Sequence, residues 1–205
     1  MIKPAKIILP TDVALSTWRG DGSIYQEKLD GRFAFRAFGN SVLAGEDVGG
    51  LFTAFDCLTA DGQDVRGLAL TDRLCATNDI CRAFGVPFVN SSADGGKFLA
   101  DVLAAGGEGV VRKLPGSSYF DTMQAAKRVA TWQCVVTALN YATGGARIKD
   151  LASGEDRGTV PLRNRSALCR VGSILKVEGL ELTAKGLIRE PRPCKDTAES
   201  WLIQF

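Results

Sequence analysis

Short apolar runs bounded by glycine and aspartate recur through residues 1–129. Runs of this kind predict β-strands, and Asp30-Gly31 and Asp61-Gly62 predict turns between strands. The expected strands cover 7–9, 24–28, 33–43, 51–58, 86–89 and 109–113. The run over 51–58, LFTAFDCL, is apolar enough to predict a buried strand.

Two segments carry apolar residues at helical spacing instead. The first predicts a helix over 70–84 with Thr71 as its N-terminal cap. The second predicts a helix over 94–105 that ends at Gly106 and Gly107. Residues 1–129 are therefore expected to form one domain that mixes strands with helices.

From residue 130 onward the pattern changes to shorter strands separated by glycine-rich turns. These strands are expected at 132–139, 146–151, 158–162, 173–177 and 186–189. Five short strands in this length fit a small barrel of the OB type, and a six-stranded sandwich fits the pattern as well. The predicted fold class is α+β, with domains at 1–129 and 130–205.

Composition narrows the class of protein. The chain has 205 residues, 45% of them hydrophobic and 23% charged, which is typical of a globular protein. The net charge of +2 does not by itself indicate a nucleic-acid partner. Arginines are concentrated late in the chain, at 147, 157, 163, 165, 170, 189 and 192. The last third is therefore the better candidate for contacting a polyanion, although an ordinary solvated surface has the same composition.

Several kinds of chemistry are excluded or disfavoured. Histidine is absent, which excludes Ser-His and Cys-His catalysis and histidine-ligated metals. The six cysteines include no CxxC pair, which disfavours a structural zinc site. The first ten residues lack the apolar core of a signal peptide, and no run is long enough to span a membrane. We expect a cytoplasmic protein with free thiols and no membrane partner.

Lys28 stands in the segment YQEKLDGRFAFR, between an expected strand and an expected turn. Its aliphatic stem could pack on the protein while its ammonium pairs with Glu27 or Asp30. Alternatively, the amine could act as a nucleophile toward an electrophile such as a nucleotide α-phosphate. The four residues KLDG alone favour the first interpretation.

A nucleophilic lysine would need carboxylates for metal ions, an aromatic platform for a base and cations for phosphate oxygens. Separate predicted strands offer a candidate for each of these parts. The candidates are Glu46, Phe55, Glu108, Lys113 and Lys127.

Five motifs occur in a fixed order along the chain: KLDG, AGE, FDCLTADGQDVRGL, GEGVVRK and AAK. Together they resemble the nucleotidyltransferase motifs of ATP-dependent DNA ligases. The C-terminal segment VGSILKVEGLELTAKGLIREPRPCKD is similar to the last strands of the ligase OB domain. The resemblance covers essentially the whole chain. It implies an ATP-grasp-like adenylation domain over 1–129 followed by an OB-type barrel over 130–205.

The resemblance also implies roles for individual residues. Lys28 would become the lysyl-adenylate and Phe55 would stack on adenine. The nucleotide-binding set it implies is Glu27, Lys28, Asp30, Arg32, Glu46, Phe55, Lys113 and Lys127, with Lys113 and Lys127 on the α-phosphate. Glu108 and Glu46 would hold Mg²⁺. Nucleic-acid contacts would come from Arg36, Arg163, Arg165, Arg189, Arg192 and Lys195, the last three in a closing motif that also orients pyrophosphate.

The implied activity is the ATP-dependent sealing of nicks in double-stranded DNA by a monomer of bacterial or phage origin. Two alternatives stay open: an RNA ligase or capping-type nucleotidyltransferase, and a catalytically weakened nucleic-acid-binding relative. No further DNA-binding domain or zinc appendage is expected.

The chain departs from the ligase pattern at several positions. Phe33 stands where the family carries an arginine, while Arg32 directly follows the glycine. Ala44 and Ala125 replace a carboxylate and a lysine, and the interval from Lys28 to Glu46 is too short to hold the usual helix. These departures put catalytic efficiency and some nucleic-acid contacts in doubt.

The spacing of Glu108 and Lys113 requires an irregular strand if both side chains are to reach the same site. Lys113 lies five positions after Glu108, so strict strand alternation would point the two side chains to opposite faces. We therefore predict an irregularity near Gly109, with Glu108 at the mouth of the strand.

Overall fold

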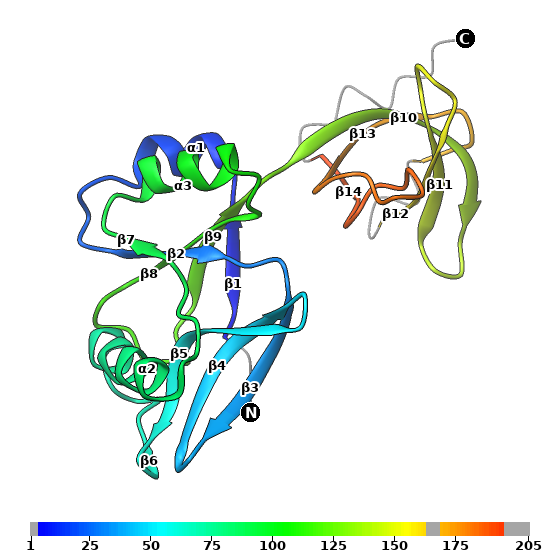
Figure 1. Ribbon diagram of the computed structural model, residues 1–205. Helices are drawn as coiled ribbons and strands as arrows, with labels where there is room; N and C mark the ends of the chain where they lie inside the picture. The colour runs from blue at the N-terminus through cyan, green and yellow to red at the C-terminus, as the bar shows by residue number, and fades with distance from the viewer. Residues whose placement is uncertain (1–3, 163–168, 195–205) are drawn as a thin grey trace. The chain divides into compact units, whose positions relative to one another are not determined.

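The computed structural model describes residues 4–162 and 169–194 and divides the chain into two compact units. Unit 1 covers Met1–Arg128 and unit 2 covers Val129–Phe205 (Figure 1). The structure is a mixed α/β fold with strongly curled sheets. Within the described residues, no helix is long and apolar enough to cross a membrane.

The first sheet of unit 1 has the strand order β1-β9-β8-β2-β7. Its strands are β1 (Lys6–Leu9), β2 (Ile24–Lys28), β7 (Ser91–Ser92), β8 (Gly109–Lys113) and β9 (Met123–Lys127). β1 runs parallel to β9, and the other neighbours are antiparallel. This sheet carries much of the site described below.

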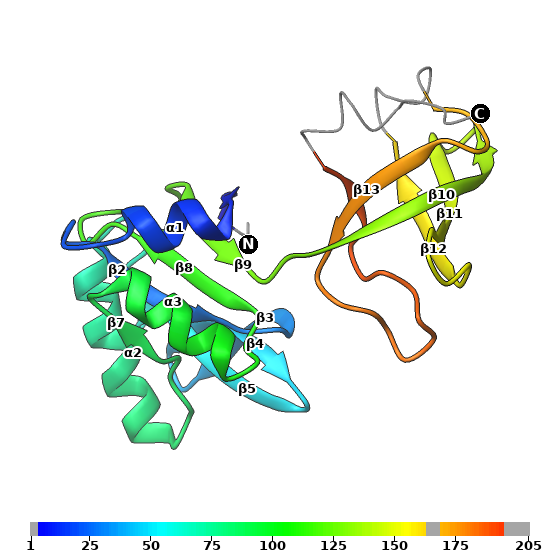
Figure 2. The same cartoon turned by 90° about the horizontal axis from the view of Figure 1, so that it is seen from above.

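Two helices, α1 (Thr11–Thr17) and α3 (Gly95–Ala104), lie side by side on one face of this sheet (Figure 2). Beneath them Trp18, Tyr25 and Leu99 form a buried apolar core with alternate residues of β8 and β9. Asp94 caps α3 by accepting a hydrogen bond from the backbone N–H of Lys97. The covered face leaves the opposite face of the sheet available for polar side chains.

The second sheet of unit 1 has the order β3-β4-β5-β6. Its strands are β3 (Arg32–Phe38), β4 (Ser41–Val48), β5 (Leu51–Ala60) and β6 (Gln63–Asp64), and helix α2 (Leu70–Phe84) packs against β5. The pairing of β4 with β5 shifts register where Ala44 opposes Asp56 but Gly45 opposes Ala54. Phe55 is therefore the extra residue of a β-bulge, a feature that redirects side chains.

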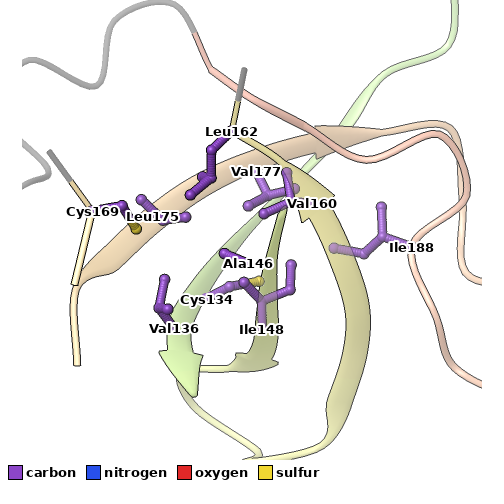
Figure 3. Packing of buried hydrophobic residues seen from close by; sticks show 10 residues of the cluster. All are labelled: Cys134, Val136, Ala146, Ile148, Val160, Leu162, Cys169, Leu175, Val177 and Ile188. Carbon is purple, nitrogen blue, oxygen red and sulfur yellow. The ribbon is translucent and has the colours of Figure 1, made fainter. Parts of the chain in front are cut away.

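Unit 2 is one antiparallel sheet with the order β12-β11-β10-β13-β14. The strands are β10 (Ala130–Asn140), β11 (Gly145–Asp150), β12 (Asp156–Pro161), β13 (Ile174–Gly179) and β14 (Arg192–Pro193). The two edge strands, β12 and β14, contact each other, so the sheet curls round on itself. Its interior is a cluster of aliphatic residues and cysteines that includes Cys134, Ile148 and Leu175 (Figure 3).

Most expected strands and both expected helices are present, with ends that match or shift by up to two residues, but the strand expected over 33–43 is a hairpin of β3 and β4. The helix that the ligase pattern places between Lys28 and Glu46 is absent, because β3 and β4 form a hairpin there. The described part of unit 2 forms a single five-stranded sheet rather than a sandwich. All six cysteines are free thiols, as expected from their spacing.

Some expectations about the elements were wrong. Helix α2 begins at Leu70 after Ala69, and Thr71 makes no capping bond. Residues 86–89 contribute only an isolated bridge from Ala54 to Phe88, because they run past β5 without forming a ladder. Residues 186–189 likewise give only a bridge from Leu182 to Ile188, and the fifth strand of unit 2 is β14.

Helix α1 and strand β9 were not predicted, and both are decided by neighbours distant in sequence. Helix α1 has seven residues and only Ala14 buried, so its sequence shows no apolar stripe. Strand β9 has the sequence MQAAK, which lacks β-branched residues. It is a strand because β1 and β8 pair with it on either side.

Candidate functional site

A pocket of about 420 Å³, counting the open space at its mouth, lies on the uncovered face of the first sheet of unit 1. The first and second sheets both contribute to its wall. It is lined by Pro4, Lys6, Gln26, Glu27, Lys28, Leu29, Phe33, Glu46, Phe55, Val111, Lys113 and Met123.

Strand alternation explains which side chains reach this pocket. Gln26 pairs with Val111, and Lys28 pairs two positions further along with Gly109, so these positions share one face of the sheet. Lys6 pairs with Met123 on the same face. The intervening residues, such as Tyr25 and Val110, point into the core beneath α1 and α3.

Lys28 and Glu108 meet at one end of the pocket. The Lys28 ammonium donates a hydrogen bond to a carboxylate oxygen of Glu108, and both side chains are largely buried, at 15% and 8% exposure. β8 starts at Gly109, whose φ is +154° and where a Cβ would lie 2.1 Å from the Ala126 carbonyl oxygen. The predicted irregularity is therefore confirmed, and only glycine fits there.

Lys127 lies beyond the same end of the sheet. It pairs with Gly109, which in turn pairs with Lys28, so Lys127 and Lys28 occupy the same face with one strand between them. Lys127 is buried but does not line the pocket. Its backbone carbonyl accepts a hydrogen bond from the Thr11 hydroxyl.

Phe55 forms an aromatic wall farther along the pocket. The Lys113 ammonium lies 4.9 Å from the centroid of the Phe55 ring and donates to the Phe55 carbonyl at 3.5 Å. The Gln26 amide nitrogen donates to the same carbonyl at 3.2 Å. The Gln26 amide oxygen is buried and has no hydrogen-bond partner among the described residues. The structure thus brings Lys113 to the aromatic wall, whereas the resemblance placed it on an α-phosphate.

Behind Phe55 lies a buried ion pair between Asp56 and Arg73. Two guanidinium nitrogens of Arg73 donate to the two Asp56 oxygens at 2.8 and 3.1 Å, and the side chains are 2% and 4% exposed. The Lys113 ammonium lies 3.8 Å from Asp56. Burial lowers the pKa of Lys113, and the Asp56 charge opposes that shift. Burial also raises the pKa of Tyr119, which lies near the same carboxylate.

β3 brings Phe33, and not Arg32, to the pocket. Phe33 pairs with Glu46, and both line the pocket, while Arg32 pairs with Asp47 on the opposite face and is exposed. The Phe33 ring centroid lies 5.9 Å from that of Phe55 and 4.9 Å from that of Phe35. The alternation of β3 therefore separates Arg32 from the other proposed nucleotide-binding residues.

Of the remaining predicted carboxylates, Glu46 and Glu27 line the pocket. Glu46 is buried and accepts a hydrogen bond from the Gly31 backbone N–H at 3.1 Å. Glu27 accepts one from the Asn90 side-chain amide at 2.9 Å. Asp30 is exposed and does not line the pocket.

The predicted nucleic-acid-binding arginines that the structure describes are all in ion pairs. Arg36 pairs with Asp47 at 2.8 Å and lies over the Phe52 ring. In unit 2, Arg189 pairs with Glu181 at 3.1 Å and Arg192 with Glu178 at 3.0 Å. Arg163, Arg165 and Lys195 lie outside the described residues.

Sequence reasoning gave no role to Lys6, Gln26 and Phe33, which line the pocket, or to the ion pair of Asp56 and Arg73 behind it. A polar residue within an apolar strand was the available signal for Gln26 and Asp56. Arg73 carried a weaker signal, because an arginine on a helix is normally solvated. Nothing in the local sequence of Lys6 indicated a role.

The donor set could accept a hard cation. Among residues 4–162 and 169–194 no cluster of three or more His, Cys, Asp or Glu side chains is present. The Glu108 carboxylate contacts Lys28, and the Glu46 carboxylate lines the same pocket. Mg²⁺ is commonly held by one or two carboxylates together with substrate phosphates, so this set fits it.

Part of the chain is similar in sequence to known proteins. No protein-family profile matches it. A probable DNA ligase of Mycobacterium avium (strain 104) is 36% identical over 107 residues, which covers 46% of this chain and 20% of the relative. A probable DNA ligase of Mycolicibacterium paratuberculosis (strain ATCC BAA-968 / K-10) matches with the same identity and coverage. The chain thus spans about a fifth of the length of these curated relatives.

Solved structures match over nearly the full chain. A Lig E DNA ligase, described as binding DNA with a minimal scaffold, has a TM-score of 0.70 at 16% identity, over 95% of this chain and 99% of that one. The fold is that of solved DNA ligases. The ligase domain of M. tuberculosis LigD gives a TM-score of 0.55 at 16% identity, over 93% of each chain. The ligase fold is thus kept at low sequence identity, and residue roles must be argued from the pocket itself.

Proposed function

We propose that this protein is an ATP-dependent DNA ligase that seals nicks in duplex DNA through a lysyl-AMP intermediate. The observation that carries the proposal is Lys28, whose amine is held by Glu108 at one end of a pocket walled by Phe55. The curated relatives are probable DNA ligases, and a solved neighbour is a mycobacterial DNA ligase D complexed with ATP. That neighbour has 16% identity and a TM-score of 0.54.

In the first step the Lys28 amine attacks the α-phosphorus of ATP. A nitrogen–phosphorus bond forms, and the bond from that phosphorus to the pyrophosphate oxygen breaks. An ammonium has no free electron pair, so a proton must leave Lys28 first, and the hydrogen-bonded Glu108 carboxylate is placed to accept it. The adenylyl group then passes to a 5′-phosphate, and a 3′-hydroxyl displaces AMP to close the strand.

The pocket wall supports a purine as the bound base. The Phe55 ring offers a stacking face, and Val111 lines the same pocket. The Gln26 amide oxygen can accept a hydrogen bond from an exocyclic amine, and the Lys113 ammonium can donate to a ring nitrogen. We therefore assign Lys113 to the base and keep Lys127 for the α-phosphate.

Glu108 and Glu46 would hold Mg²⁺ together with nucleotide oxygens. When bound, the cation supplies charge neutralisation for the phosphates. Glu46 is oriented for this by the Gly31 N–H, which fixes one of its oxygens. Glu27 lines the pocket and stays assigned to the nucleotide site, whereas Asp30 and Arg32 do not line it and are assigned there by the resemblance alone.

The division into two compact units supports the domain assignment. Unit 1 corresponds to a nucleotidyltransferase adenylation domain, and unit 2 to an OB-type barrel. The OB assignment is supported by the curled five-stranded sheet, in which β10 pairs with both β11 and β13. Arg36, Arg189 and Arg192 would contact phosphates of nicked DNA, and a monomer is expected to suffice.

A second candidate is a catalytically weakened relative that binds nucleic acid. The specific observation in its favour is Phe33, which places an aromatic ring in the pocket where the ligase pattern has an arginine. Such a protein would bind nicked DNA without closing it.

Covalent labelling tests the proposal. The protein is incubated with Mg²⁺ and ATP labelled at the α-phosphate, then denatured and separated by electrophoresis. We expect the label to stay on the chain and to be lost in Lys28→Ala. Lys28→Arg should fail as well, because a guanidinium stays protonated.

Nicked substrates then separate the alternatives. A nicked DNA duplex should be joined, while the same nick in RNA should not. Labelling that persists in Lys28→Ala would remove Lys28 as the nucleophile. Labelling without joining of any nick would favour the weakened relative.

A further inference from the structure

We propose that Asp56 is a positioning residue for nucleotide binding, an inference that rests on the proposed function. Together with Arg73, it fixes the Lys113 ammonium and the Phe55 ring at the wall where the base lies. Neither Asp56 nor Arg73 lines the pocket, so both would act through their neighbours.

Asp56 is held from several directions at once. Both of its oxygens accept from Arg73, and the Cys57 backbone N–H donates to one of them at 2.9 Å. Arg73 also donates to the backbone carbonyls of Leu68 and Ser117, at 2.5 and 2.8 Å. The ion pair thus ties β5 to α2 and to the loop after β8.

The bulge in β5 explains why such a tie is needed at this point. A bulged residue is left out of the regular ladder, so strand pairing alone does not set the direction of its side chain. Phe55 is that residue, and Asp56 follows it directly. The Phe55 carbonyl receives hydrogen bonds from Gln26 and Lys113, so fixing Asp56 and Lys113 also fixes Phe55.

Lys113 depends on the same carboxylate for its charge. Its ammonium is buried and lies 3.8 Å from the Asp56 carboxylate. The other groups facing it are Arg73 from α2 and Tyr119 beside Asp56, while Lys6, Lys28 and Glu46 line the same pocket. Without Asp56, Arg73 and Lys113 would face each other with no negative charge between them.

The decisive variant removes both charges of the pair. Asp56→Asn alone leaves the buried Arg73 uncompensated and can unfold unit 1. Asp56→Asn with Arg73→Gln keeps the shape and leaves no unpaired guanidinium. The matched control is Asp64→Asn with Arg66→Gln, because that pair has the same residue types, lies in the same unit and is exposed.

ATP binding is measured by calorimetry across a pH series, beside covalent labelling of Lys28. We expect the double variant to fold and to bind ATP roughly 10- to 100-fold more weakly, as for loss of a hydrogen bond from a charged group. As the pH rises, its affinity should also fall off at a lower pH than in the wild type. Asp56 raises the pKa of Lys113 more than Arg73 lowers it, so losing both lets the ammonium lose its proton earlier. The control pair should change neither quantity.

A purely structural role predicts a different result. The double variant would then have lower thermal stability but wild-type ATP affinity and pH profile, which overturns the proposal. If the wild type binds ATP but forms no adenylate, the ligase function fails, while a loss of ATP affinity in the double variant still supports Asp56. If the wild type binds no ATP, both proposals are wrong.

Discussion

Unit 1 and unit 2 differ in how deeply their charged side chains are buried. Unit 1 buries Glu46, Asp56, Arg73 and Lys113 in or behind its pocket. Unit 2 has an apolar interior, and most ion pairs among its described residues, such as Arg147 with Asp156, lie at the surface, although Arg157 is buried. Buried charges are expensive to desolvate, so a protein keeps them where their fields act on a ligand.

The difference in burial indicates that the two units serve different purposes. A buried, fully hydrogen-bonded set of charges is rigid and suits a reaction that requires one geometry. Surface arginines stay hydrated and adaptable, which suits contacts with a phosphate backbone. Three experiments test this comparison, beginning with the largest expected effect.

Glu108→Gln should depress self-adenylation by about 10²- to 10⁴-fold, the range typical of losing a general base. The amide keeps the size of the side chain and can still contact Lys28, but it cannot take up a proton. Single-turnover labelling at saturating ATP measures the step, with a Mg²⁺ titration to test whether metal dependence changes too. Glu155→Gln in unit 2 is the control, because that carboxylate is exposed. A wild-type rate and metal dependence in Glu108→Gln would remove Glu108 from the site.

Arg73→Met should lower the free energy of unfolding by about 3–5 kcal/mol, because it leaves the buried Asp56 carboxylate without its main partner. Arg147→Met in unit 2 breaks an exposed pair and should change it by about 0–1 kcal/mol. Urea unfolding followed by tryptophan fluorescence measures both variants. Equal losses would contradict the comparison between the units.

Replacing Arg189 and Arg192 with glutamine should weaken binding of the pre-adenylated protein to nicked DNA. The slope of log affinity against log salt should drop by about 2, since two phosphate contacts are removed. Adenylating the protein beforehand separates this effect from any role in orienting pyrophosphate. An unchanged salt slope would mean that the pairs with Glu181 and Glu178 serve only unit 2 itself.

The sequence predicted the strands and helices that have a clear pattern of residues within the element itself. Alternation and turn residues predicted β2 and β8, and helical spacing predicted α2 and α3. Such patterns did not predict helix α1, which has one buried residue, or strand β9, which consists of weak strand formers.

The sequence by itself also determined the break that appears at Gly109, because the spacing of Glu108 and Lys113 requires it. That conclusion needed only residue order and the two-residue period of a strand. The reactive roles of Lys28 and Glu108 came from the resemblance of the KLDG and GEGVVRK motifs to those of DNA ligases and stay predictions.

Tertiary structure alone decided which side chains share the pocket. The bulge at Phe55 and the pairing of Phe33 with Glu46 brought one aromatic wall together and left Arg32 outside. The parallel pairing of β1 with β9 brought Lys6 in from far along the chain, and α2 supplied Arg73 to Asp56. Strand register and helix docking depend on contacts between distant segments, so no local pattern could have assigned these residues to one site.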